Sequence, residues 1–217
     1  AAAVEAMLWG ARGAAHAGQP QPESAPYKHL REALAKAREV GIGTAAVDGP
    51  NPVTVDTCGT WTYTYTAGKA GVRPGGGIRV ALRHMNHCWT TVQDTDPTAD
   101  GFLTVASPDN VLFTVLVECN NWSEKFFDLY HPVQNIVEVL VGEPGLKPGQ
   151  TLRITFGDRS QGSRGMLAEP FDETDYIFQT FVDALGHDDF LPMAGSPTIE
   201  IIASEAVRLA VVAPSDA

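Results

Sequence analysis

The sequence predicts a mainly β protein, an antiparallel β-sandwich of the immunoglobulin-like or a related kind, with one N-terminal α-helix. From residue 53 onward, apolar and polar residues alternate with a period of two, which indicates half-buried strands. Turn residues recur at roughly eight- to twelve-residue intervals, which gives about eight to ten strands. Helical patterns do not alternate with these strands, so a parallel nucleotide-binding sheet is disfavoured.

The N-terminal part divides into an arm and a helix. Residues 1–26 are rich in Ala and Gly and end in a Gln-Pro-rich stretch, which predicts an extended arm. Residues 27–42 predict a helix that begins after Pro26, ends at Gly41 and packs on the sandwich. Its apolar residues are spaced by three and four positions: Tyr27, Leu30, Leu34, Ala37 and Val40. A helix that docks a second domain or subunit is the alternative.

Residues 50–214 are predicted to form the β-sandwich domain. The strongest strand signal lies at residues 60–66, where aromatic residues alternate with threonine. Three glycines precede a second alternating strand at residues 78–83. Further strands are expected at residues 102–106, 111–117, 136–141, 152–156, 176–183, 198–202 and 207–212. The Pro148-Gly149 turn predicts that 136–141 and 152–156 pair as a hairpin.

The length, net charge and apolar runs of the chain restrict the classes of function that it can have. The chain has 217 residues, enough for one domain of generous size or for a domain with an appendage. Its net charge of -11 repels phosphate backbones and disfavours nucleic-acid binding. No apolar run reaches the roughly 18 residues that a membrane helix needs. The chain starts without Met, so a processed or truncated end is expected, and the cytoplasm is favoured as the compartment.

Three cysteines occur, Cys58, Cys88 and Cys119, and an odd number cannot pair completely within one chain. Their wide spacing fits no metal-finger pattern. Each lies in or beside an apolar stretch that resembles a strand, so buried free thiols are expected.

Four groups of motifs carry a resemblance to a known family. They are GTWTYTYTAG at residues 59–68 with GGGIRV at 75–80; Trp89 with QDTDP at 93–97 and GFLTV at 101–105; GLKPGQ at 145–150 with FGDRSQGS at 156–163; and FVD at 181–183 with APS at 213–215. In order and spacing, the stretch from Thr60 to Pro214 resembles the N-terminal β-sandwich segment of a bacterial domain-of-unknown-function family. Full-length members of that family resemble polymerase-and-histidinol-phosphatase type metal-dependent hydrolases.

The resemblance implies an accessory role. In such proteins the sandwich precedes a barrel-like hydrolase domain, whose His-containing metal motif follows soon after the Ala-Pro-Ser equivalent. No such motif is present here, so the resemblance assigns no catalytic residue and implies no cofactor in this chain. It implies a non-catalytic structural or interaction module, partnered with a hydrolase domain in cis or as a separate subunit. A divalent metal is then expected only in that partner domain, and a homo-oligomer is left open.

The main alternative is a small metal-dependent hydrolase in its own right. His84, His87 and Cys88 are zinc-ligand types at close spacing, and His131 supplies a further imidazole. On a strand, His84 and His87 point to opposite faces, so one ion needs a turn between them. The family resemblance does not supply these histidines.

The loop at residues 157–165 is the first choice for contact with an anion or with a neighbouring domain. Arg159 and Arg164 offer guanidinium groups that bind carboxylate or phosphate in a bidentate way, beside the carboxylate of Asp158. The structural alternative is a loop in which Asp158 caps the turn and pairs with an arginine. A phosphate-cradling P-loop is excluded, because the Gly-Lys-Ser/Thr ending is missing.

Three further groups of side chains each suit either a functional or a structural role. The carboxylates Glu169, Asp172, Glu173 and Asp175 suit calcium or a solvated face. The group Asp183, His187, Asp188 and Asp189 suits acid–base work or a polar turn. The aromatic residues Trp61, Tyr63, Tyr65, Trp89 and Trp122 suit either a carbohydrate-stacking surface, which makes a carbohydrate- or anion-binding sandwich a third candidate function, or the core.

Overall fold

The computed structural model describes residues 25–83, 92–108, 110–119 and 133–205. They form one helix, α2 (Ala25–Val40), and thirteen strands, so the mainly β class with one helix is confirmed. The predicted arm lies outside the described residues except for its last two positions, and so does the strand expected at 207–212. Within the described ranges, no helix is both long and apolar enough to cross a bilayer.

The strands follow the helix along the rest of the chain. They are β1 (Gly43–Asp48), β2 (Val53–Thr54), β3 (Cys58–Gly59), β4 (Trp61–Ala67), β5 (Gly77–Arg83), β6 (Leu103–Ala106), β7 (Phe113–Cys119), β8 (Val133–Val141), β9 (Thr151–Phe156), β10 (Met166–Leu167), β11 (Glu173–Asp183), β12 (Leu191–Pro192) and β13 (Thr198–Ile202).

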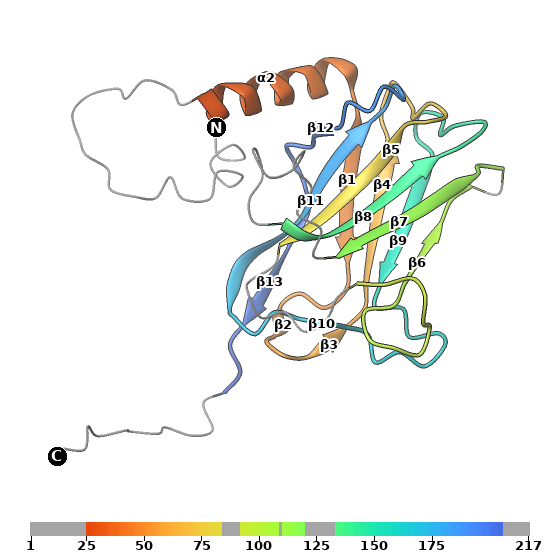
Figure 1. Ribbon diagram of the computed structural model, residues 1–217. Coiled ribbons are helices and arrows are strands. Elements are labelled where there is room, and N and C mark those ends of the chain that lie inside the picture. The colour runs from red at the N-terminus through yellow and green to blue at the C-terminus, as the bar shows by residue number, and fades with distance from the viewer. Residues whose placement is uncertain (1–24, 84–91, 109, 120–132, 206–217) are drawn as a thin grey trace, which may run out of the picture.

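Two sheets dominate the architecture (Figure 1). The four-stranded sheet has the order β1-β4-β9-β6. The seven-stranded sheet has the order β2-β13-β11-β5-β8-β7, with β12 also paired to β11. The named strands pair antiparallel except β2 with β13, which run parallel. A short ribbon of β10 and β3 closes one end.

The core lies where the two sheets face each other. The strict alternation of β4 buries Trp61, Tyr63 and Tyr65 completely, as the sequence predicts, because successive side chains of a strand point to opposite faces. The two sheets then meet directly. The rings of Phe156 on β9 and Phe178 on β11 have centroids 5.6 Å apart. The Tyr63 hydroxyl and Thr180 Oγ1 are hydrogen-bonded at 2.8 Å.

Helix α2 begins at Ala25, so the prediction that Pro26 precedes the helix is wrong. Proline is favoured in the first helical turn, because the N–H that it lacks has no partner within the helix there. The predicted end is confirmed. Gly41 has a φ of 70°, and the Ile42 N–H bonds the Ala37 carbonyl at 3.3 Å, which is a glycine-terminated helix end. Leu30, Leu34 and Ala37 of the apolar stripe are buried, and α2 lies beside β12 (Figure 1).

One sequence-based expectation about strand arrangement is corrected. Strands β8 and β9 do not form a hairpin. Strand β8 pairs with β5 and β7, whereas β9 pairs with β4 and β6 in the other sheet. Residues 142–150 therefore cross between the sheets, held by the bridge between Val72 and Leu146. Strand β1 was not predicted, because this edge strand exposes every second residue and Val47 is its one sizeable apolar side chain.

Candidate functional site

The predicted contact loop lies at the end of the molecule opposite to α2. We call residues 157–165 the arginine loop and residues 93–102 the facing loop; together they form the loop end (Figure 1). The arginine loop leaves β9 and enters β10, whereas the facing loop leads into β6. The Gly101 N–H donates to the Gly165 carbonyl at 2.9 Å, which joins the two loops through their backbones.

Arg164 is clamped by a carboxylate from the facing loop. Its Nε donates to Asp100 Oδ1 at 3.0 Å, and its Nη2 donates to Asp100 Oδ2. This bidentate geometry fixes the plane of the guanidinium. The hydrogen bond from Arg164 lowers the pKa of Asp100 below its ordinary value. The Arg164 side chain nevertheless stays 76% exposed, against 26% for Asp100, so the guanidinium is held in place and still faces water.

Asp158 caps the turn at the start of the arginine loop. Its Oδ1 accepts the Ser160 N–H at 2.8 Å, and its Oδ2 accepts the Thr104 hydroxyl at 2.7 Å. The bond from the Ser160 backbone is the largest cause that lowers the pKa of Asp158. Turn capping by Asp158, as in the structural alternative, is confirmed. Its carboxylate accepts its hydrogen bonds from Ser160 and Thr104, so the predicted pairing with an arginine is replaced by these two donors.

Arg159 ties the arginine loop to the strand ribbon. Its Nη2 donates to the Cys58 carbonyl of β3. The guanidinium lies over Gly165, whose φ of 114° is disfavoured for residues with a side chain. A Cβ at Gly165 would lie 2.6 Å from the Gly59 carbonyl oxygen and 2.9 Å from Arg159 Nε. The positive φ and the close Gly59 carbonyl therefore require glycine at this position, and its missing Cβ leaves room for Arg159.

The facing loop is organised by one amide side chain. Gln93 Oε1 accepts the N–H groups of Thr95 and Asp96 at 2.9 and 2.8 Å, and its Nε2 donates to the Asp96 carbonyl at 2.8 Å. The hydroxyl and N–H of Thr98 bond Asp96 Oδ1 and lower the Asp96 pKa. These bonds hold the loop that carries Asp100. Neither Gln93 nor Asp100 was predicted as a site residue. Asp100 bonds Arg164, 64 positions away in the sequence, whereas Gln93 acts within its own loop.

The loop end can bind a charged partner through donors that are already positioned. A guanidinium has five N–H donors, and the bidentate pair leaves Arg164 with donors that Asp100 does not use. Arg159 also stays exposed while one of its nitrogens bonds the Cys58 carbonyl. Both side chains therefore present cationic groups at fixed positions, which suits carboxylate or phosphate oxygens on another molecule.

No family model, curated protein or solved structure matches this chain. The resemblance to the bacterial domain-of-unknown-function family therefore stays a prediction. What the chain does has to follow from its own residues and their contacts.

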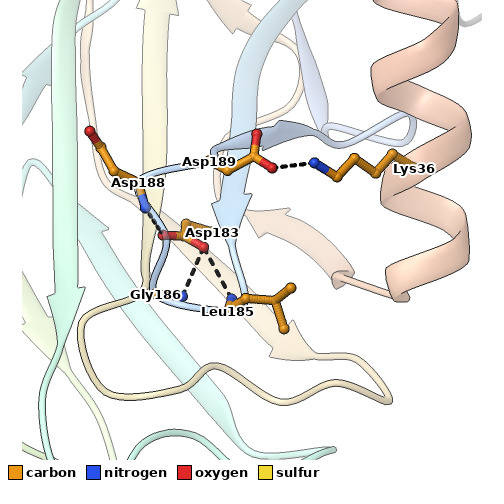
Figure 2. A network of polar contacts seen from close by, with 6 residues as sticks. All are labelled: Lys36, Asp183, Leu185, Gly186, Asp188 and Asp189. Carbon is orange, nitrogen blue, oxygen red and sulfur yellow. Dashed lines mark hydrogen bonds and ion pairs between the residues drawn. The ribbon is translucent and has the colours of Figure 1, made fainter.

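The turn at residues 183–189 has a structural role in the described geometry (Figure 2). The Asp183 carboxylate is only 1% exposed. It accepts the N–H groups of Leu185 at 3.1 Å, Gly186 at 2.9 Å and Asp188 at 2.8 Å. A carboxylate occupied by three backbone donors is a turn cap rather than a free base, which favours the polar turn over acid–base work.

Charged contacts brace this turn against the helix and the sheet. Lys36 of α2 pairs with Asp189 (Figure 2). Arg79 of β5 pairs with Glu138 of β8, and its guanidinium carbon lies 3.5 Å from the centroid of the Phe190 ring. Arg79 Nη2 is also 3.8 Å from Asp188 Oδ1. We call the turn at 183–189, β12 and α2 the helix end of the molecule.

The remaining candidates are the aromatic residues of β4 and a group of carboxylates at residues 169–175, of which Glu169 is buried. Trp61, Tyr63 and Tyr65 are fully buried, so a carbohydrate-stacking surface built from them is wrong. Burial also raises the pKa values of both tyrosines. The carboxylates Glu169, Asp172, Glu173 and Asp175 line an open hollow of about 430 Å³. In the part of the chain that the structure describes, no three His, Cys, Asp or Glu side chains are grouped to hold a metal ion.

Several predicted residues lie outside the described part. They are His84, His87, Cys88 and His131 of the alternative metal site, and Trp89 and Trp122 of the aromatic group. The metal site therefore stays a prediction. Among the cysteines, Cys58 is free and half-buried, while the side chains of Cys88 and Cys119 are outside the described part.

Proposed function

We propose that this chain is a non-catalytic structural and interaction module, a β-sandwich of the immunoglobulin-like or a related kind. Its partner is a metal-dependent hydrolase domain in the same polypeptide or in a separate subunit, and the partner carries the divalent metal. One observation carries the proposal: exposed Arg164 is clamped by Asp100 at the loop end, in a geometry that presents a fixed cation to a partner.

Pre-organisation is the physical reason that this surface suits partner contact. A flexible arginine loses side-chain freedom when it binds, at a cost of about 0.5–1.5 kcal/mol for each immobilised side chain. Asp100 already orders Arg164, and the Cys58 carbonyl already orders Arg159. The loops are in turn held by Asp158, Thr104 and Gln93. The arginine side chains therefore lose less freedom when a partner binds at the loop end.

Charge favours an acidic contact on the partner. The chain as a whole carries a net charge of -11, so an acidic partner is repelled from most of its surface. Arg159 and Arg164 offer two exposed guanidinium groups on one loop, although aspartates of the same end lie beside them. A carboxylate on the hydrolase domain can therefore bind there through individual hydrogen bonds to these guanidinium groups rather than through a net positive charge.

The test measures binding between this chain and the hydrolase domain encoded with it, in the same reading frame or in a neighbouring gene. Calorimetry or biolayer interferometry compares wild type with Arg164→Ala and Asp100→Asn. We expect Arg164→Ala to weaken binding about tenfold, equivalent to about 1.4 kcal/mol. Arg153→Ala is the matched control, because Arg153 is an exposed arginine on β9 outside the arginine loop.

Two results would overturn the proposal. One is equal affinity of wild type and Arg164→Ala for the hydrolase domain, or no binding by either. The other is turnover of bis(p-nitrophenyl) phosphate by this chain alone, at enzyme-like rates, with stoichiometric metal found by elemental analysis. The second result would favour the alternative hydrolase with His84, His87 and His131 as ligands.

A further inference from the structure

Strand β7 forms an exposed apolar edge of the seven-stranded sheet. It pairs on one side with β8, and no other strand among the described residues pairs with its outer side. Leu112, which immediately precedes the strand, is 69% exposed, and Leu116 within it is 42% exposed. Phe113 is also exposed. Large apolar side chains beside an unpaired edge are typical of a surface that binds another strand.

The backbone directions of β7 follow from its bonds to the neighbouring segment. The Leu112 N–H donates to the Glu143 carbonyl at 3.0 Å, and the Leu112 carbonyl accepts the Gly142 N–H at 2.7 Å. In an antiparallel pair, these directions alternate along the strand. Thr114 and Leu116 therefore direct their backbone groups toward β8. Phe113, Val115 and Val117 direct theirs outward from the sheet.

Within the described residues, β7 lacks the usual protection of an edge strand. Natural edges carry Lys, Pro or a bulge, or they are very short. Strand β7 has no Lys, Arg or Pro, and its register with β8 runs without a shift along its whole length. The other edges differ, since β6 has 4 residues, β2 has 2 residues and β1 ends in Asp48.

We propose that β7 pairs antiparallel with β7 of a second copy of this chain, around a two-fold axis at Leu116. The two seven-stranded sheets then join into one continuous sheet. Val115 of each copy lies opposite Val117 of the other, so their outward N–H and carbonyl groups exchange hydrogen bonds. Leu116 lies opposite Leu116 of the second copy, as a non-hydrogen-bonded pair, which covers its exposed side chain.

The second copy is the occupant that this strand suits best. The edge offers backbone donors and acceptors, so it requires an extended strand, and β7 itself is an uncharged strand apart from Glu118. The two-fold arrangement places Glu118 opposite Thr114, so no like charges face each other. One paired edge buries less than a standard interface of about 1,600 Å², so a weak, reversible dimer is expected.

Sedimentation of the full chain from about 1 to about 500 µM tests the proposal, because a reversible dimer dissociates on dilution. We expect a monomer–dimer equilibrium for wild type and monomers throughout for Leu116→Lys, which places two ammonium groups opposite each other. Phe171→Lys is the matched control, since Phe171 is an exposed apolar side chain away from β7. Far-UV circular dichroism verifies that each variant is folded. A monomeric wild type, or an unchanged dimer in Leu116→Lys, would overturn the proposal.

Oxidative cross-linking tests the register. Opposing residues of a non-hydrogen-bonded antiparallel pair have Cα atoms about 4.5 Å apart, within reach of a disulfide. Leu116→Cys should therefore form a covalent dimer above the wild-type background, whereas Thr114→Cys should not. Cross-linking of Thr114→Cys alone would contradict the two-fold at Leu116.

The inference is independent of the proposed hydrolase partner, because the arginine loop contributes nothing to β7. Arg164→Ala should leave the monomer–dimer equilibrium of the chain unchanged. A dimer that depends on Arg164 would overturn the assignment of the interface to β7.

Discussion

The helix end and the loop end of this molecule are each organised by an aspartate, but the aspartates take their partners from different distances along the chain. Asp183 accepts backbone N–H groups from the residues that directly follow it. Asp158 combines one such bond with the hydroxyl of Thr104, and Asp100 reaches across to Arg164. The bonds of Asp183 therefore close a single turn. The bonds of Asp158 and Asp100 connect separate segments of the chain, and the Arg164 side chain still faces water.

The charged side chains of the two ends differ in how far they are buried, and this difference indicates different roles for the two ends. The Asp183 side chain is almost fully removed from water, so its bonds contribute mainly to the stability of the turn. Arg164 and Asp100 keep contact with water, so their pairing contributes little free energy and mainly fixes position. The helix end thus behaves as a structural closure, whereas the loop end behaves as a presented surface.

The largest expected effect comes from Asp183→Ala at the helix end. The change removes a buried carboxylate and leaves three partly buried backbone N–H groups without their acceptor. We expect a loss of about 2–4 kcal/mol in the free energy of unfolding. Urea unfolding followed by tryptophan fluorescence measures it. Asp189→Ala is the matched control, since it removes the exposed pair with Lys36 and should cost at most about 0.5 kcal/mol.

An equal loss for the two variants would contradict the comparison. It would mean that the charge network around the turn, rather than the buried cap, stabilises the helix end. Asp183→Asn refines the result, because one amide oxygen replaces two carboxylate oxygens at the same position.

Asp158→Ala at the loop end should have a smaller effect. It removes the bonds from Ser160 and Thr104, and the half-buried site lets water replace them in part. We expect a loss of about 1 kcal/mol in the free energy of unfolding. A double-mutant cycle with Thr104→Val isolates the bond between the two side chains. Coupling of about 0.5 kcal/mol or more is expected, and strict additivity would show that the bond does not contribute.

The features that the sequence predicted correctly have a physical cause within a few neighbouring residues. The alternation of β4 predicted its buried aromatic face, because the side-chain period of a strand is two. Gly41 predicted the end of α2, because glycine adopts the left-handed conformation readily. The turn cap by Asp158 was also predictable, since it bonds the backbone two residues further on.

The features that the sequence did not predict depend on pairing between segments that are distant along the chain. The Pro148-Gly149 turn marks a reversal of the chain, but it does not reveal that β8 and β9 belong to different sheets. Asp100 and Arg164 were separately visible as charged residues, yet nothing in either neighbourhood indicates the other. The arginines of the loop were predicted as a contact site, whereas the carboxylate that holds Arg164 had to come from the structure.

The loop end also predicts a dependence of stability on acid pH. The pKa values of Asp100 and Asp158 are lowered in the folded state. Their contribution to stability is complete above the unfolded pKa of about 3.9, and it is lost as the pH falls toward the folded values. Urea unfolding from about pH 6 to about pH 2 measures this loss. Asp100→Asn and Asp158→Asn should each flatten the decline.

Arg164→Gln provides the control for this dependence, because it removes the main cause of the lowered Asp100 pKa without removing the carboxyl group. It should flatten the decline in the same direction as Asp100→Asn but less, because the Arg164 backbone still bonds Asp100. A decline as steep as in wild type for both variants would contradict the assignment to this pair.

The smallest expected effect is that of Arg164→Ala on stability, and this prediction distinguishes the two ends most directly. An exposed ion pair contributes about 0–1 kcal/mol, because water solvates both charges once they separate. We therefore expect a change of about 0.5 kcal/mol or less in the free energy of unfolding, close to that of Arg153→Ala, measured in the same urea experiment. Arg164→Lys keeps the charge but loses the bidentate geometry, so it should be as stable as wild type while binding the hydrolase domain less tightly. A loss as large as that of Asp183→Ala would show that Arg164 holds the loops together, and the loop end would then be a structural closure like the helix end.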